Sequence, residues 1–174
     1  YSTVRPMVVM SSKQQQIALV TGSSSGIGFK TSLCLARNGI YTYATIRNLS
    51  KSNEILGYAG KENLPLKILR LDVTDEESIS ESIDKIIIEK NRIDIVVNNA
   101  GYSLLGPLEQ LHIDEIKEEF ETNFFGIIKL IQSVLPIMRK QGYGRIINIT
   151  AGLDSLYHQP MSVLSLPWKG LQNP

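Results

Sequence analysis

The stretch that decides the fold reads IALVTGSSSGIGFKTSLCLARNG, from Ile17 to Gly39. Its first four residues are all apolar, which is typical of a short strand buried on both faces of a parallel sheet. Glycines follow at positions 22, 26 and 28, and a helical pattern then runs from about Ile27 to Asn38, with Gly39 as its stop. The sequence therefore predicts a strand, a glycine-rich loop and a helix in direct succession.

The glycines of this loop predict an anion site. Glycine accepts positive φ and lets the backbone come close to a ligand. Free N–H groups at a helix start, together with the helix dipole, favour an anion and most often a pyrophosphate. The spacing Gly-x-x-x-Gly-x-Gly lacks the Gly-Lys-Ser/Thr ending of a P-loop, which argues against an ATPase. Taken alone, the loop leaves a second interpretation open, a tight turn that binds nothing.

Composition limits the classes of function. The chain has 174 residues, enough for one domain, and its formal net charge of +1 favours neither nucleic acid nor a membrane surface as partner. No apolar run reaches the roughly 18 residues of a membrane span, and no metal-ligand spacing surrounds the histidines. The single cysteine, Cys34, is interpreted as a small buried residue in a reducing, cytoplasmic setting. Residues 1–14 are interpreted as a disordered lead-in.

Strand and helix patterns alternate along the rest of the chain. Strands are predicted at residues 41–46, 66–71, 93–97 and 145–149, and helices at about 51–58, 72–90 and 113–139. Thr74 and Glu77 are predicted to form a capping box in the second of these helices. Such alternation implies right-handed crossovers and a parallel sheet covered on both faces. We therefore expect a three-layer α/β/α, Rossmann-type doubly wound sheet with strand order 3-2-1-4-5.

Four motifs occur in a fixed order. The first is Thr21-Gly22-Ser23-Ser24-Ser25-Gly26-Ile27-Gly28, followed by Asp72-Val73 after the third strand, Asn98-Asn99-Ala100-Gly101 after the fourth, and Asn123 in TNFFG. Over about residues 15–150 the chain resembles the short-chain dehydrogenase/reductases, whose fingerprint is Thr-Gly-x-x-x-Gly-x-Gly. The resemblance implies an NAD(P)-binding Rossmann domain across this range.

The resemblance also implies a role for each motif. The residues of the glycine loop (Thr21, Gly22, Ser24, Ser25, Gly26, Ile27 and Gly28) would hold the pyrophosphate region. Asp72 and Val73 would contact the adenine, and residues 98–101 would line the central cleft. Asn123 matches the helix asparagine of the catalytic tetrad, which anchors a water relay. Relatives usually form oligomers through such long helices, so the region 113–139 is an expected contact between copies of the chain.

The choice of cofactor depends on the charge after the second strand. An acidic residue there usually binds the ribose hydroxyls of NAD, whereas an arginine accommodates the 2′-phosphate of NADP. This strand ends ATIRN, with Arg47 and no acidic residue. The pattern favours NADP(H), since a guanidinium–phosphate contact is strong and specific. The alternative is that Arg47 is a solvated loop charge.

The catalytic half of the resemblance is incomplete. The family uses a tyrosine, a lysine four residues later, and a serine about a dozen residues before the tyrosine. Here Thr150 is followed by Ala151 at the serine position, although Thr150 could donate a hydroxyl from one position earlier. Leu164 stands at the tyrosine position and Trp168 at the lysine position, and neither transfers a proton at neutral pH.

Two groups of residues are candidate substitutes for the missing pair. Ser165 and Lys169 are four residues apart, but Pro167 between them disfavours one continuous helix. Tyr157 lies only seven residues after Thr150, and no lysine follows it at the required spacing. Neither group reproduces the pattern of the family.

The resemblance fades soon after Thr150. Residues 151–174 are interpreted as a degenerate start of the catalytic segment, and we expect a C-terminally truncated sheet, shortened or frame-shifted, with 145–149 as an edge strand whose apolar face is uncovered. The chain then resembles an NADP(H)-preferring oxidoreductase that interconverts a carbonyl and a secondary alcohol by hydride transfer. The alternative is a catalytically inactive nucleotide-binding protein or fragment. The sequence does not specify the substrate.

Overall fold

The computed structural model describes residues 14–150. The strands are β1 (Ile17–Val20), β2 (Tyr41–Ile46), β3 (Leu66–Arg70), β4 (Ile95–Asn98) and β5 (Arg145–Asn148). The α-helices are α1 (Gly26–Arg37), α2 (Asn53–Lys61), α3 (Glu76–Lys90), α4 (Ile113–Phe120) and α5 (Gly126–Gln141). Three short elements complete the order: the 3₁₀ turns η1 (Leu49–Lys51) and η2 (Leu108–Gln110), and the π-helical turn η3 (Glu121–Phe125).

The five strands form one parallel sheet in the order β3-β2-β1-β4-β5, which confirms the predicted topology. Val20 at the end of β1 is in register with Ala44 of β2 and with Val97 of β4. The carboxyl ends of β1, β2 and β4 therefore meet at one edge of the sheet. The chain order reverses at β1, and in open sheets of this kind ligands bind at the carboxyl edge beside that point.

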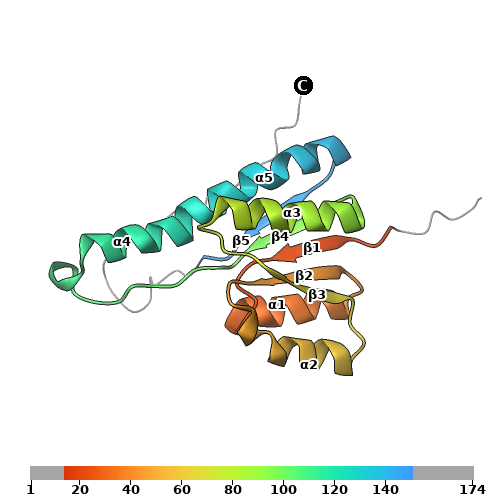
Figure 1. Ribbon diagram of the computed structural model, residues 1–174, viewed down its shortest axis with the longest axis horizontal. Helices are drawn as coiled ribbons and strands as arrows, with labels where there is room; N and C mark the ends of the chain where they lie inside the picture. Colours follow the sequence, from red (N-terminus) through yellow and green to blue (C-terminus); the bar gives the residue numbers. More distant parts are fainter. Residues whose placement is uncertain (1–13, 151–174) are drawn as a thin grey trace, which may run out of the picture.

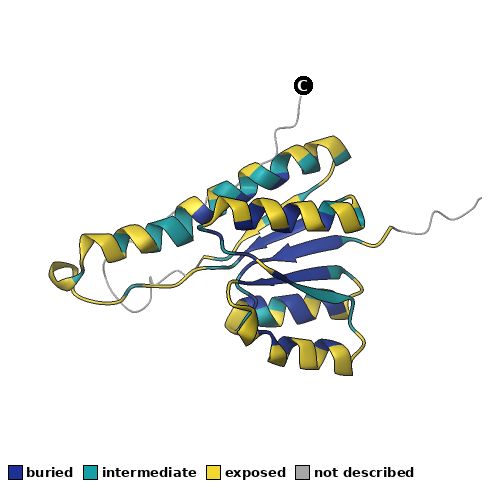
Figure 2. Ribbon diagram, viewed as in Figure 1, coloured by how far each residue is buried: buried dark blue, intermediate teal, exposed yellow. Residues whose placement is uncertain are grey.

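Helices cover both faces of the sheet, as Figure 1 shows: α1 and α2 lie on one face, α3 and α5 on the other. Leu19 of β1 and Val96 of β4 pack toward Leu130 and Val134 of α5, and all four are fully buried. On the opposite face, the side chain of Ile55 from α2 joins a second apolar cluster under α1. The central strand β1 is buried on both sides (Figure 2), which explains why its sequence, IALV, is continuously apolar.

The start of α3 differs from the prediction. Asp75 is the N-cap, and its carboxylate accepts hydrogen bonds from the backbone N–H groups of Glu77 and Ser78. Thr74 instead directs its hydroxyl to Asp72 Oδ1, at 2.8 Å. The predicted Thr74–Glu77 capping box is therefore wrong, because an aspartate one residue later competes better for the same N–H groups.

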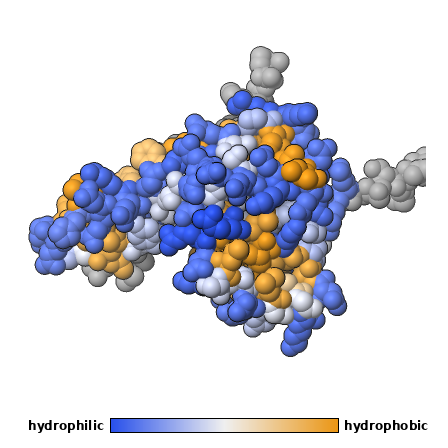
Figure 3. Space-filling model, in the orientation of Figure 1, coloured by the Kyte–Doolittle hydropathy of each residue, from blue (hydrophilic) through white to orange (hydrophobic). Residues whose placement is uncertain are grey.

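The predicted helix over 113–139 is interrupted. It consists of α4, one π-helical turn and α5, and the turn contains Asn123. A π turn inserts one extra residue into the helical ladder, and such turns are frequent at functional sites. None of the residues of α4 is buried, and the helix extends beyond the sheet (Figures 1 and 2). Apolar side chains interrupt the polar surface of this projecting arm in Figure 3, where Leu105, Leu108 and Ile113 are exposed.

Two further expectations concern exposure. Cys34 is exposed, so its interpretation as a buried residue is wrong: the buried positions of α1 are Gly28, Ser32, Leu33 and Ala36, and Cys34 lies off that face. The expectation for β5 is confirmed within the described residues, since β5 pairs with β4 alone and Ile147 is 44% exposed. None of the helices between residues 14 and 150 has the length and apolar character needed to cross a bilayer.

Replacing Tyr43 with phenylalanine tests a polar contact at the edge of the core. The Tyr43 hydroxyl donates to Glu89 Oε2 at 2.8 Å while the ring is fully buried. Tyr43→Phe should lower the free energy of unfolding by about 1 kcal/mol at neutral pH, because one hydrogen bond is lost.

The difference should shrink in alkali. Burial, aided by the hydrogen bond to Glu89, raises the pKa of Tyr43 in the folded chain. Above about pH 10 the unfolded chain releases this proton and the folded chain keeps it, so wild-type stability falls as pH rises. Urea unfolding at neutral pH and at about pH 10.5 measures both effects. An unchanged difference between the two proteins would contradict the assignment.

Candidate functional site

The first two residues of α1, Gly26 and Ile27, are exposed. Ser25 is its N-cap residue, yet the Ser25 side chain makes no capping hydrogen bond, and the first turn contains no acidic residue. Helix α3 is the opposite case, with the Asp75 cap and acidic side chains at Glu76 and Glu77. The first N–H groups of α1 therefore lack the side-chain acceptor that α3 provides, and the helix dipole adds positive potential there. This helix start is suited to an anionic ligand group.

The glycines of the preceding loop are required for different reasons. Gly22 (φ +67°) and Gly26 (φ +60°) adopt the left-handed conformation that glycine favours. A Cβ atom on Gly28 would overlap Asn99 Nδ2, whereas a Cβ on Gly26 would meet nothing within 4 Å. Packing against Asn99 therefore requires glycine at position 28, whereas a Cβ at position 26 would meet no neighbouring atom. Ser24, Ser25 and Ile27 complete the loop, and Ile27 is 60% exposed.

Two buried serines, Ser23 and Ser32, support the glycine loop through hydrogen bonds. Ser23 Oγ lies 2.9 Å from Ser32 Oγ and 3.1 Å from the carbonyl oxygen of Val20, and Ser32 Oγ lies 2.8 Å from the carbonyl oxygen of Gly28. Both serines are fully buried. Sequence reasoning missed Ser32, although a hydroxyl on the buried face of a glycine-loop helix is a signal that could have revealed it. The pair connects the end of β1, the loop and the first turn of α1.

Thr21 and Asn99 join the ends of β1 and β4. Thr21 Oγ1 accepts hydrogen bonds from the backbone N–H groups of Asn99 and Ala100, both at 2.9 Å. The Asn99 amide in turn donates to the carbonyl oxygens of Thr21 (3.0 Å) and Gly22 (3.1 Å). Asn98 instead donates across the sheet to Asn148 Oδ1, at 2.8 Å. The motif 98–101 thereby fixes the glycine loop to the middle of the sheet.

Asn123 holds the segment that follows this motif. Its Oδ1 accepts from the backbone N–H of Tyr102 at 3.1 Å, and its Nδ2 donates to the Tyr102 carbonyl oxygen at 2.6 Å. A Cβ on Gly101 would lie 2.8 Å from Asn123 Oδ1, so this close approach also requires glycine. The structure thus brings Asn123 to the loop after β4, and within residues 14–150 its Oδ1 accepts this one hydrogen bond, so it has capacity for a second.

Arg47 directly follows β2 and is exposed. Its side chain forms no hydrogen bond or ion pair with any residue between 14 and 150. The positive charge of Arg47 acts on the hydroxyl of Tyr102, a residue that sequence reasoning did not single out. Burial raises the pKa of Tyr102, nearby Glu118 and Glu119 raise it further, and Arg47 opposes them. Arg47 follows β2 and Tyr102 lies in the segment after β4, so both are at the carboxyl edge of the parallel sheet.

Asp72 and Val73, the second and third residues after β3, have different surroundings. The Asp72 carboxylate remains half-buried beside Thr74, whose backbone N–H donates to Asp72 Oδ1 at 3.0 Å. The Val73 side chain is buried in the apolar core near Gly126, where a Cβ would approach Val73 Cγ2 to 2.8 Å. A ligand at this position could meet the side chain of Asp72 and the backbone of Val73, but not the Val73 side chain.

The residues expected to carry catalysis fall at the end of the described chain or outside it. Thr150 is exposed and lies just beyond β5. Leu164 and Trp168, and the substitutes Tyr157, Ser165 and Lys169, lie outside the described residues. Residues 14–150 therefore contain the predicted cofactor half of the site.

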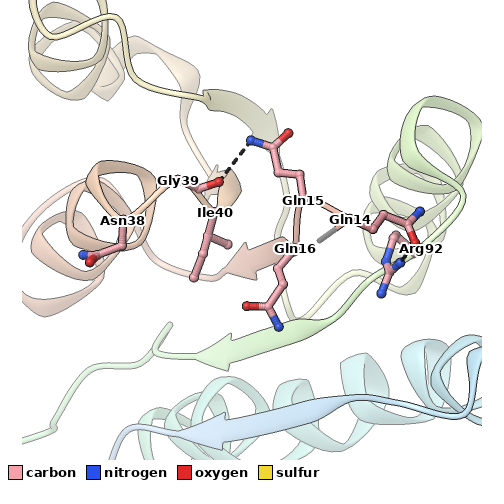
Figure 4. Close-up of a pocket in the computed structure, with 7 residues that line it drawn as sticks. All are labelled: Gln14, Gln15, Gln16, Asn38, Gly39, Ile40 and Arg92. Carbon is pink, nitrogen blue, oxygen red and sulfur yellow. Dashed lines mark hydrogen bonds between the residues drawn. The ribbon is translucent and has the colours of Figure 1, made fainter. Parts of the chain in front are cut away.

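A shallow pocket of about 470 Å³ lies at the opposite edge of the sheet, between the amino ends of β1 and β2. Figure 4 shows its polar lining, in which Gln15 donates to the carbonyl oxygen of Gly39 and Arg92 contacts Gln14. None of the residues predicted from the motifs lines it. The pocket is thus separate from the glycine loop.

Substituting Gly28 with alanine tests the close approach of the loop to Asn99. The added methyl group would overlap both the Asn99 amide and the carbonyl of Gly22, so Gly28→Ala should lower the free energy of unfolding by about 1–3 kcal/mol. Gly57→Ala is the matched control, because a Cβ there meets open space within α2 and should stabilise the chain by about 0.5–1 kcal/mol. Equal effects in urea unfolding would contradict the packing argument.

Substituting Thr21 with valine tests the connection between β1 and β4. Valine keeps the shape but leaves the Asn99 and Ala100 N–H groups without their acceptor, at a cost of about 1–3 kcal/mol for each group that finds no other partner. Thr21→Ser retains the hydroxyl and should remain within about 1 kcal/mol of wild type. Denaturant unfolding of the three proteins measures this, and comparable losses in both variants would show that the hydroxyl is not the important group.

Comparison with known proteins adds independent findings. The family model described as short chain dehydrogenase matches residues 16–162. The chain is 38% identical over 138 residues to 3-ketodihydrosphingosine reductase from Bacteroides thetaiotaomicron, an alignment that covers 79% of this chain and 48% of the relative. It is 36% identical over 137 residues to human retinol dehydrogenase 8, covering 76% and 43% of the two chains. The chain spans about half the length of the curated relatives it matches.

Solved structures agree with these matches. A metagenomic short-chain oxidoreductase in complex with NADP superimposes with a TM-score of 0.74 at 26% identity, covering 78% of this chain and 62% of that one. On its sequence, its fold and these likenesses together, the chain belongs to the short-chain dehydrogenase/reductase family.

Proposed function

We propose that this chain is an NADP(H)-preferring oxidoreductase that interconverts a carbonyl group and a secondary alcohol by hydride transfer. The observation that carries the proposal is the open start of α1 behind the glycine loop, with Arg47 exposed at the end of the neighbouring strand. The names of the relatives include both a reductase and a dehydrogenase, which supports this reaction class without fixing its direction.

The residues of the loop fit a dinucleotide. A Cβ on Gly26 would meet open space, so a phosphate group has room beside the N–H groups of α1. Asp72 and the backbone of Val73 would take the adenine end, and residues 98–101 would line the middle of the cleft. When bound, the nicotinamide would supply the hydride chemistry, and the protein's contribution would be binding and orientation.

The preference for NADP(H) rests on charge. No acidic residue lies between the start of β2 and Glu54, and an acidic residue in that stretch would be needed to bind the 2′-hydroxyl of NAD. Arg47 offers a guanidinium without a competing carboxylate partner among residues 14–150. The NADP and NADPH complexes among the structural neighbours are consistent with this choice.

Proton transfer would depend on Asn123 and Thr150. Asn123 would keep the Tyr102 segment in place and could anchor a water through Oδ1, and Thr150 could donate its hydroxyl to a substrate oxygen. Leu164 and Trp168 at the tyrosine and lysine positions favour a second candidate function, nucleotide binding without catalysis. Turnover of simple ketones and secondary alcohols with NADPH or NADP distinguishes the two.

Replacing Arg47 with alanine tests the cofactor assignment. Titration with 2′,5′-ADP and with 5′-ADP separates the 2′-phosphate from the rest of the nucleotide. Arg47→Ala should weaken 2′,5′-ADP binding about 10- to 100-fold, the range expected for a charged hydrogen bond, and leave 5′-ADP binding unchanged. Arg139→Ala is the control, because Arg139 is exposed near the far end of α5.

The same titrations with NADPH and NADH complete the test. Wild type should bind NADPH more tightly than NADH, and the variant should lose most of that difference. A wild-type chain that is folded but binds neither nucleotide would overturn the proposal. Equal affinity for both nucleotides would overturn the preference for NADP(H) alone.

A further inference from the structure

Lys129 connects three separate elements near the carboxyl edge of the sheet. Its Nζ donates to the carbonyl oxygen of Thr74 at 3.2 Å and pairs with Glu121 Oε1 at 2.5 Å. Glu76 Oε1, on the first residue of α3, lies 4.0 Å away. Because Lys129 belongs to α5, it joins this helix to the loop between β3 and α3 and to the π turn. Figure 1 shows α3 and α5 side by side on the same face of the sheet.

The Lys129 side chain is largely buried and carries a positive charge, and both properties strengthen these contacts. Its side chain is only 24% exposed. The hydrogen bond to Glu121 raises the pKa of Lys129, and the charges of Glu121, Glu76 and Asp75 add to this effect, so the ammonium group stays charged at neutral pH. A partly buried charge-assisted hydrogen bond is stronger than a neutral one. The ammonium group of Lys129 therefore makes a charge-assisted hydrogen bond to the Thr74 carbonyl oxygen.

A second contact acts on the same loop. Gly126, one turn before Lys129 on α5, lies so close to Val73 that a Cβ would reach Val73 Cγ2 at 2.8 Å and the Val73 carbonyl oxygen at 3.0 Å. The loop is thus pressed against α5 at Val73 and bound to it at Thr74. Within the loop, Asp72 Oδ1 accepts from both the N–H and the hydroxyl of Thr74. Any movement of Thr74 would therefore be passed to Asp72.

We infer that Lys129 is a positioning residue, which holds the Asp72–Thr74 loop against α5 and thereby sets the adenine end of the cofactor site. The inference rests on the proposed function, because the loop matters for binding only if it contacts the nucleotide. Lys129 also pairs with Glu121 in the turn that carries Asn123. It therefore couples the adenine end of the cleft to the helical segment on which Asn123 lies.

Hydrogen exchange and nucleotide binding test this inference together. Lys129→Met keeps the length of the side chain and removes its charge. Exchange at the Thr74 and Asp75 amides should become about tenfold faster, while exchange in the glycine loop stays unchanged. The affinity for 5′-ADP should fall by about tenfold.

Lys129→Arg should restore both the exchange rates and the affinity. Lys140→Met, which changes an exposed lysine of the same helix, should alter neither. Lys129→Gln provides the same test if the methionine variant does not fold.

The outcomes separate this inference from the proposed function. If wild type binds 5′-ADP and Lys129→Met binds it equally well, the positioning role is overturned and the cofactor assignment stands. Unchanged exchange at Thr74 and Asp75 would also overturn it, whatever the binding result. If folded wild type binds no adenine nucleotide, the proposed function is wrong and the inference falls with it.

Discussion

The structure depends on the connection between β1 and β4 that Thr21 and Asn99 make at the carboxyl edge of the sheet. One threonine hydroxyl accepts from two successive N–H groups, and one asparagine amide returns two hydrogen bonds to the start of the glycine loop. The strands pair by their own backbone groups only as far as Val97. Beyond that point these side chains supply the hydrogen bonds in place of the sheet ladder, and they fix the start of the glycine loop between the end of β1 and the beginning of α1.

Two helices, α1 and α3, begin at the same edge, and they differ in how their N-termini are capped. The start of α3 is closed by Asp75 and by acidic side chains, whereas the start of α1 receives no such group. A helix start without a side-chain cap costs stability, and a ligand that carries negative charge can recover it. Gly26 adds to this, because a Cβ there would meet no atom within 4 Å, so this glycine leaves room beside the helix start.

Much of the fold could be predicted from local sequence. The apolar run at 17–20 is buried throughout, as in a covered parallel sheet, and the alternation of strands with helices predicted the parallel arrangement. Less local features escape such reasoning. The π turn at 121–125 breaks a helix whose apolar spacing is continuous, and it contains Asn123, which bonds the distant Tyr102 backbone. The exposure of Cys34 is a similar case, because helical periodicity alone does not fix which side of α1 meets the sheet.

The sequence by itself determined the fold class and the family, because glycine spacing, apolar runs and the motif residues are local properties that each carry a definite backbone or packing requirement. Only the tertiary structure decided which side chains support that place. Ser23 with Ser32, Asn123 with Tyr102, and Lys129 with Thr74 are pairs separated by 9, 21 and 55 positions. No pattern within a single helix or strand records such contacts, since they arise only when crossover connections bring distant segments to the same edge of the sheet.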